Sequence, residues 1–99
     1  MGMLRYTPAA RDDLREIRRF IAQDNPVRAK WFVGELGEHC KRLAAAPLIH
    51  AVQTRIDRRA RKAVHGVYLI FYETADDGIQ VLRVVHSAFD LTELALRPD

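Results

Sequence analysis

The fold is decided by Val67-Tyr-Leu-Ile-Phe-Tyr-Glu73, the turn Asp76-Asp77-Gly78, and Ile79-Gln-Val-Leu-Arg-Val-Val-His86. Two runs of β-branched and aromatic residues separated by Asp-Gly predict a β-hairpin. Neither run alternates cleanly between apolar and polar residues, so both faces of the hairpin need a cover. We expect both strands to be central in a sheet, with helices over one face and a partner protein over most of the other.

The composition is that of one ordinary globular domain. The 99 residues are 48% hydrophobic and 29% charged, too apolar for a disordered chain. No apolar run approaches the roughly 18 to 20 residues of a membrane span, and the single Cys40 suits a reducing cytosol. We expect a cytoplasmic, single-domain protein over residues 1–99 with no cofactor, and we interpret Met1-Gly2 as a cloning scar.

Two helices are predicted before the hairpin, after a short strand at residues 4–6. Thr7-Pro8 and Asn25-Pro26 each combine an N-cap residue with a first-turn proline, so the helices begin near residues 8 and 26. The first ends near residue 23 and the second before Pro47, while Trp31 falls off the apolar stripe, at a helix edge or in solvent. The stripe residues are Ala10, Leu14, Ile17, Phe20 and Ile21, then Ala29, Phe32, Val33, Leu36, Cys40 and Leu43.

An edge strand at residues 63–65 precedes the hairpin, and residues 91–96 form a short helix capped by Asp90 or Thr92 within a C-terminal tail, 91–99. The order is therefore β-α-α-β-β-β. This is an α+β fold, with a helical hairpin packed on one face of a small, mainly antiparallel sheet.

The last strand sets which residues share a sheet face. If it is regular, residues 82, 84 and 86 lie on one face and residues 81, 83 and 85 on the other. The face without helices keeps an apolar strip, and such a strip usually marks a binding surface. An amphipathic segment of another protein would bury it.

Positive charge is concentrated in residues 55–62, where five cations face only Asp57. Such a run is most often a solvated loop. In a protein of net charge +3 it also favours contact with nucleic acid or with an acidic protein. The cations are Arg55, Arg58, Arg59, Arg61 and Lys62.

No metal site is expected, because His39 and His50 have no ligand spacing with Cys40 or with each other. No second thiol or positioned base accompanies Cys40 in the sequence. We interpret it as a small core residue.

Five motifs, in order over about residues 4 to 91, resemble the ParE branch of the RelE/ParE toxins of bacterial toxin–antitoxin modules. They are Thr7-Pro-Ala-Ala-Arg-Asp-Asp-Leu-Arg-Glu-Ile17, Asn25-Pro26, Leu43-Ala-Ala-Ala-Pro47, Tyr68-Leu-Ile-Phe-Tyr72 and Val81-Leu-Arg-Val-Val-His86. The resemblance implies a helical hairpin over an antiparallel sheet, a ParD-like antitoxin whose disordered tail wraps the toxin, growth inhibition, and a role in plasmid stabilisation. Phe89 departs from the pattern, since a basic residue is common there.

Three functions follow from the resemblance. ParE-type toxins inhibit DNA gyrase by binding, RelE-type relatives cleave messenger RNA on the ribosome, and a third reading is an inactive regulatory homologue. RNA cleavage needs an acid, a base and cations near the phosphate, for which Arg61, Arg83 and His86 are the candidates. On a regular strand His86 faces away from Arg83, and the terminal stretch lacks the Tyr or Lys of many RelE-like ribonucleases. The sequence favours inhibition of gyrase over RNA cleavage, and we assign no catalytic residue.

The binding residues follow from the same comparison. We expect the antitoxin's apolar residues to dock on the helical hairpin and the open sheet face, and its acidic residues to reach the arginine cluster. Glutamate in place of Val81 and Val85 should then weaken antitoxin binding. For Arg83 the alternative is an ion pair with Glu73 or Asp90, and for His86 it is a strand-end histidine satisfied by the backbone. Antitoxin-binding residues are Arg58, Arg59, Arg61, Val81, Arg83 and Val85, and target-binding residues are Arg83, His86, Phe89 and Asp90.

Overall fold

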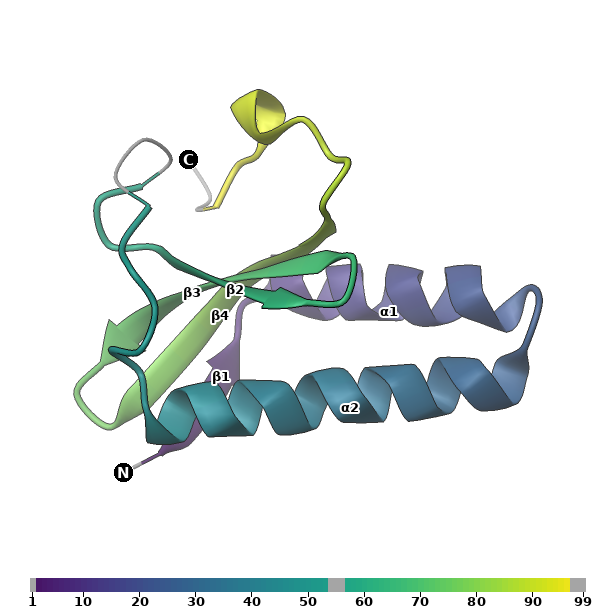
Figure 1. Cartoon of the computed structure of the whole chain (residues 1–99), viewed down its shortest axis with the longest axis horizontal. Coiled ribbons are helices and arrows are strands. Elements are labelled where there is room, and N and C mark those ends of the chain that lie inside the picture. Colours follow the sequence, from purple (N-terminus) through teal and green to yellow (C-terminus); the bar gives the residue numbers. More distant parts are fainter. Residues whose placement is uncertain (1, 54–56, 97–99) are drawn as a thin grey trace.

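In the computed structural model, which describes residues 2–53 and 57–96, a helical hairpin covers one face of a four-stranded sheet (Figure 1). The predicted order β-α-α-β-β-β and the α+β class are confirmed. No helix within the described ranges is long and apolar enough to cross a membrane. The elements are β1 (Met3–Tyr6), α1 (Pro8–Ala22), α2 (Pro26–Ala45), β2 (Arg61–His65), β3 (Tyr68–Ala75), β4 (Gly78–His86) and the 3-10 turn η1 (Leu91–Glu93).

The sheet order is β1-β4-β3-β2, so the predicted hairpin strands are the central pair. β3 pairs antiparallel with both neighbours, whereas β1 runs parallel to β4. The start of β1 lies against the hairpin turn, where Arg5 binds both carboxylate oxygens of Asp77 and holds its pKa down at about 2. A Cβ on Gly78 would lie 1.9 Å from the Met3 carbonyl oxygen, so the glycine is required by this close approach.

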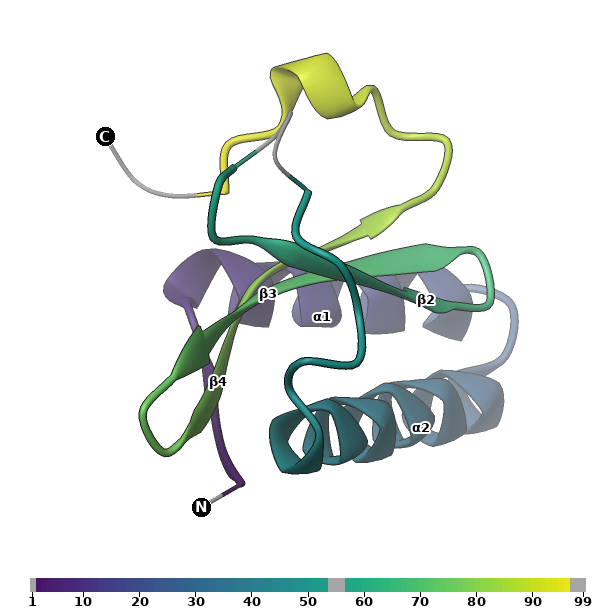
Figure 2. The same cartoon turned by 60° about the vertical axis from the view of Figure 1, so that its left-hand side comes forward.

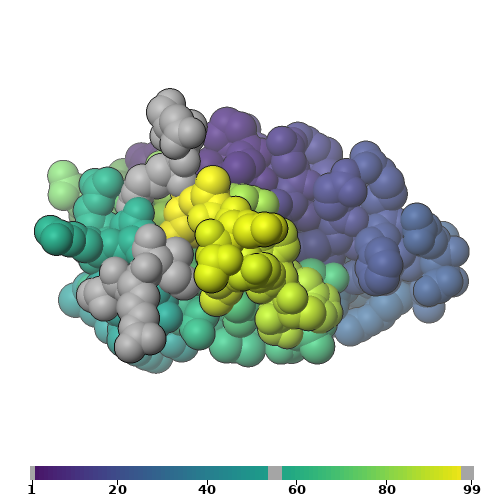
Figure 3. Space-filling model, turned by 90° about the horizontal axis from the view of Figure 1, so that it is seen from above, coloured from purple at the N-terminus to yellow at the C-terminus, as the bar shows by residue number. Residues whose placement is uncertain are grey.

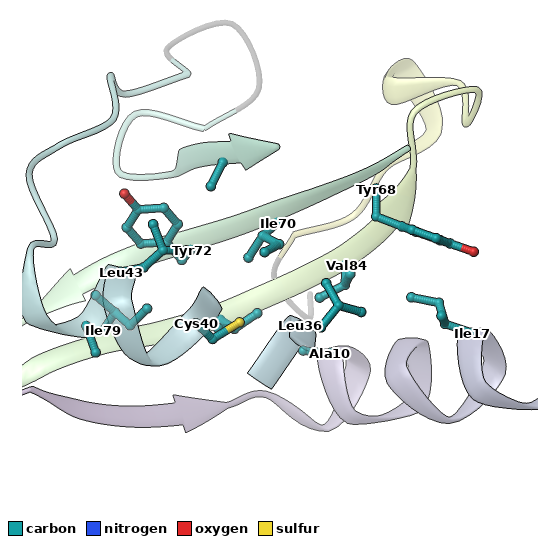
Figure 4. Close-up of a cluster of buried hydrophobic side chains, with 13 residues drawn as sticks. Ala10, Ile17, Leu36, Cys40, Leu43, Tyr68, Ile70, Tyr72, Ile79 and Val84 are labelled. Carbon is teal, nitrogen blue, oxygen red and sulfur yellow. The ribbon is translucent and has the colours of Figure 1, made fainter. Parts of the chain in front are cut away.

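Both helices begin as predicted, at side-chain caps followed by proline. Thr7 Oγ1 accepts a hydrogen bond from the backbone N–H of Ala10, and Asn25 Oδ1 accepts one from that of Arg28, each at 3.0 Å. Side chains of both helices meet β3 and β4 in a buried layer that we call the helix-side core (Figure 4). Its buried members are Ala10, Ile17, Leu36, Cys40, Leu43, Ala44, Ala63, Tyr68, Ile70, Tyr72, Ile79, Val81 and Val84.

Two residues of the helical hairpin test the apolar stripes that were predicted to be buried. Cys40 is 1% exposed in the helix-side core, as expected for a small core residue, and burial raises the pKa of its thiol. Phe20, in contrast, is 67% exposed, so its place in the predicted buried stripe is wrong. The helical hairpin extends beyond the end of the sheet, which leaves little sheet beneath the last turn of α1 (Figure 1).

The other sheet face is covered by the chain itself. Residues 91–96, which we call the strap, cross this face after leaving β4 (Figures 2 and 3). Leu96 of the strap is buried against the sheet, and Leu91 and Leu94 are partly buried there. The expectation that a partner covers most of this face is therefore wrong. The buried members of this strap-side core are Ala60, Leu69, Phe71, Leu82, Val85 and Leu96.

A β-bulge in β4 changes the predicted assignment of side chains to faces. Tyr72 pairs with Val81 but Phe71 pairs with Arg83, so Leu82 is an extra residue in β4. The alternation slips by one position at the bulge, so Val81 and Val84 lie together in the helix-side core, and Leu82 and Val85 lie together in the strap-side core. Val81 and Val85 thus lie on opposite faces, at 0% and 6% exposure, and the open surface predicted for them does not exist.

Candidate interaction surfaces

Arg83 joins the helical layer to the strap. Its Nε and Nη2 donate to the Asp13 carboxylate on α1 at 2.7 and 3.0 Å, and its Nη1 donates to the Ala95 carbonyl at 3.1 Å. The Asp13 hydrogen bond raises the pKa of Arg83. Both side chains are largely buried, at 20% and 15% exposure. Glu73 and Asp90 were predicted as alternative ion-pair partners of Arg83, and this prediction is therefore wrong. The contact with Asp13 was missed because the two residues are 70 positions apart along the chain.

Asp13 also completes the exposed edge of β4. β1 pairs with β4 only as far as Val81, so the backbone groups beyond it have no strand neighbour on that side. Thr7 Oγ1 donates to the Leu82 carbonyl at 2.8 Å, and Asp13 Oδ2 accepts from the Val84 N–H at 2.9 Å. Two side chains from the start of α1 thus replace the missing strand.

Beside this edge, the structure brings three of the four predicted target-binding residues together. Arg83, His86 and Phe89 line a shallow hollow of about 300 Å³, together with Phe20 and Tyr68. The ring of His86 packs edge-on to Tyr68 at 5.4 Å, and its Nδ1 accepts the Ala88 N–H at 3.0 Å. Phe89 is 41% exposed. The hollow therefore offers exposed aromatic surface to a partner, beside the charged side chains of Glu16 and Arg83.

The fourth predicted residue, Asp90, does not line this hollow. Its carboxylate accepts hydrogen bonds from the N–H and the hydroxyl of Thr92 at the start of η1, and these bonds lower its pKa. Its visible role is to cap the turn that begins the strap.

The three candidates for ribonuclease chemistry are not brought to one point. Arg61 lies on β2 and Arg83 and His86 on β4, with β3 between them, so the strands are about 10 Å apart. Arg61 donates to the His50 carbonyl, and Arg83 is bound by Asp13. No acid, base and free cation converge here in the way that phosphate cleavage needs.

The arginine cluster lies at the end of the loop that precedes β2. Arg58 and Arg59 are exposed, and the Arg59 N–H is held by Asp57 Oδ1 at 2.8 Å. Neither arginine side chain forms an ion pair with the part of the chain that is described. Nucleic-acid contact through residues 55–62 stays a prediction, and Arg55 of that run lies outside the described residues. Met1, which we interpret as part of a cloning scar, and residues 97–99 of the predicted tail also lie outside them.

A histidine pair was missed from the sequence. His39 Nδ1 on α2 and His65 Nδ1 on β2 are 2.8 Å apart, so one ring donates to the other. Burial lowers the pKa of His39, and the charges of His65, Arg42 and His50 lower it further. Residues 2–53 and 57–96 contain no group of three or more side chains placed to hold a metal. No spacing signal links two residues that are 26 positions apart on different elements.

The comparison with protein families decides how these surfaces are to be understood. The model of the ParE toxin of the type II toxin–antitoxin system parDE matches residues 4–91. The chain belongs to the ParE toxin family. The match ends where the strap begins, so most of the strap-side cover of this ParE chain lies beyond the matched region.

Among solved structures, the ParE chain is similar to one described as the chromosomal ParDE toxin–antitoxin system from P. aeruginosa. The TM-score is 0.70 at 21% identity, over 87% of this chain and 98% of that chain. At this identity the likeness establishes the fold alone. The search of curated proteins finds no match.

Proposed function

We propose that this ParE toxin acts by inhibiting DNA gyrase and is neutralised by a ParD-like antitoxin. The match to the ParE family over residues 4–91 carries the proposal. Arg61 is separated from Arg83 and His86 by β3, and both arginines are held by internal contacts, which supports binding rather than RNA cleavage because neither arginine is a free cation beside His86.

For contact with gyrase, the aromatic hollow beside the free edge of β4 is the best-formed surface among the predicted target residues. His86 and Phe89 are exposed there beside Phe20, so a partner would bury aromatic area without unfolding the toxin. Arg83 contributes mainly by holding the walls of the hollow together, since its guanidinium is already bound.

For contact with the antitoxin, the burial of the second sheet face leaves the helical hairpin as the predicted apolar docking site. Acidic antitoxin residues would meet Arg58 and Arg59, which are exposed and have no ion pair with described residues. Arg61 and Arg83 are already occupied by internal contacts, and Val81 and Val85 are covered.

The test uses the purified toxin in two assays, supercoiling by gyrase and messenger RNA cleavage on ribosomes. Inhibition of supercoiling with intact message is the expected result. Phe89→Ala and His86→Ala should each weaken the inhibition about tenfold, as expected for exposed residues at an interface centre. Cuts in the ribosomal A site would refute the gyrase proposal. A purified toxin that affects neither supercoiling nor messenger RNA would identify an inactive homologue.

A further inference from the structure

The outer side of the helical hairpin carries an apolar hollow close to the turn that joins α1 to α2. Val27 and Trp31, one helical turn apart on α2, are 67% and 65% exposed. Together with Pro26 they line a hollow of about 520 Å³, and Arg18 and Lys30 complete its rim. Trp31 is the only tryptophan of the chain. A tryptophan side chain is usually well buried, but this one is exposed to solvent.

The two cations at the rim are not neutralised. Four other cations of the hairpin have acidic partners, in the pairs Arg15–Asp12, Arg19–Glu16, Arg28–Glu35 and Lys41–Glu38, whereas Arg11 and Arg42 lack one among the described residues but lie outside this hollow. Arg18 and Lys30 have no ion pair with any described residue. The hollow therefore combines an aromatic floor with two available positive charges.

This charge pattern separates the conceivable occupants. A symmetric contact between two copies of the chain would bring Arg18 and Lys30 against the same cations of the second copy, which is unfavourable. An acidic amphipathic helix meets both features, since its apolar side would cover Trp31 and Val27 while its carboxylates reach the two cations.

The helix start that carries the site is held by local contacts before any partner binds. Asn25 caps the first turn of α2 and Pro26 fixes its first residue, so Trp31 stands one turn into a firmly started helix. A tryptophan side chain has only two rotatable bonds, so covering it on a fixed helix costs little conformational entropy.

We propose that the hollow at Trp31 and Val27 is the docking site of an acidic amphipathic helix of the antitoxin. This rests on the proposed function, and it specifies where on the hairpin the antitoxin binds and what the bound segment must look like. The helix carries apolar residues three or four positions apart, flanked by aspartate or glutamate.

The experiment uses the full toxin and, as the probe, the purified protein encoded by the adjacent reading frame. Affinity is measured by titration calorimetry for the wild type, Trp31→Ala and the double variant Arg18→Glu with Lys30→Glu. We expect Trp31→Ala to weaken binding about tenfold or more, and the charge reversal to weaken it about tenfold and to flatten its salt dependence. Val64→Ala is the matched control, because Val64 is a similarly exposed apolar residue, at 59%, that lines neither this hollow nor the one proposed for gyrase.

Gyrase inhibition by the same variants separates this inference from the proposed function. Trp31→Ala should still inhibit supercoiling but resist neutralisation by the probe. If the wild type binds the probe and Trp31→Ala or the charge reversal binds it equally well, the inference is overturned and the proposed function stands. Loss of gyrase inhibition in Trp31→Ala with unchanged probe affinity would make the hollow a target surface and would also overturn the inference.

The wild type tests the proposed function itself. A wild type that does not bind the probe refutes the antitoxin partner and the inference together, whereas a wild type that binds the probe without inhibiting gyrase refutes only the proposed target. Circular dichroism confirms that each variant is folded.

Discussion

The two faces of the central hairpin have similar apolar character but very different covers. One face lies under α1 and α2, whose buried side chains form the helix-side core. The other lies under six residues of strap, of which only Leu96 is buried and Leu91 and Leu94 are partly buried (Figure 2). The sheet residues are nevertheless equally buried, with Phe71 and Tyr72 both at 0% exposure on opposite faces. A short segment can therefore hide an apolar face that seems from sequence to require a partner.

The difference lies in how each cover is held. The helices begin at side-chain caps and bury residues of several turns against the sheet, whereas the strap depends on its leucines, on the Asp90 cap and on the Arg83–Ala95 hydrogen bond. We expect the helix-side core to tolerate no charge and the strap-side core to tolerate partial loss of its cover. Four predictions test this contrast.

The largest effect is expected for Val81→Glu. Val81 is fully buried under the helices, so the substitution places a carboxylate without a partner in the core and should lower the free energy of unfolding by about 4 kcal/mol or more. Urea denaturation measures the loss. Val64→Glu, on the sheet surface at 59% exposure, is the control and should change stability by less than about 0.5 kcal/mol. A stable Val81→Glu variant with weakened antitoxin binding would restore the interface predicted for this residue.

Truncation of the strap-side core should cost less than a buried charge. Leu82→Ala leaves a cavity at a position that is 1% exposed and should lower stability by about 3 kcal/mol, whereas Leu96→Ala should cost about 2 kcal/mol because the strap can close part of the gap. Denaturation of the two single variants and of the double variant gives their coupling. Additive losses would indicate that Leu82 and Leu96 do not share one core.

The sequence predicted what depends on local chemistry and periodicity. The caps at Thr7 and Asn25, the Asp-Gly hairpin and the element order follow from rules that act over a few residues, and all are present. The β4 bulge at Leu82 could not be predicted, because a bulge is set by how β4 meets β1, β3 and the start of α1 rather than by its own pattern.

The missed contacts of the candidate sites have a similar cause. Nothing near Asp13 in the sequence marks it as a structural residue, yet it binds Arg83, 70 residues later, and the edge of β4. The strap was predicted as a tail for contact with a partner or target. The spacing of Leu91, Leu94 and Leu96 does not reveal that this segment folds back on the sheet of the same chain. Exposure of Trp31 was one of two alternatives that the helical stripe left open, and the structure selects it.

The link between the two covers is tested by Asp13→Ala. The change frees Arg83 from its carboxylate, leaves the Val84 N–H without an acceptor, and should lower stability by about 2 kcal/mol. Asp12→Ala is the matched control, since Asp12 pairs with Arg15 at the exposed surface and should matter by less than about 1 kcal/mol. Thermal unfolding compares the two variants. Equal midpoints would show that the Arg83–Asp13 pair contributes no more than a surface ion pair.

The smallest effect concerns the open side of the helix-side core, where His39 of α2 meets His65 of β2. Burial and the neighbouring charges of His65, Arg42 and His50 lower the folded-state pKa of His39 below its ordinary value of about 6.5. Between these two pKa values the unfolded chain binds more protons, so stability is complete above about pH 7 and is lost as the pH falls through about 6.5. Solvent screening limits the loss to a fraction of a kcal/mol. Urea midpoints measured between about pH 7.5 and 5 should therefore fall less in His39→Gln than in the wild type. If the urea midpoint depends on pH equally in the wild type and in His39→Gln, the packing of α2 against β2 is stabilised by apolar contacts alone.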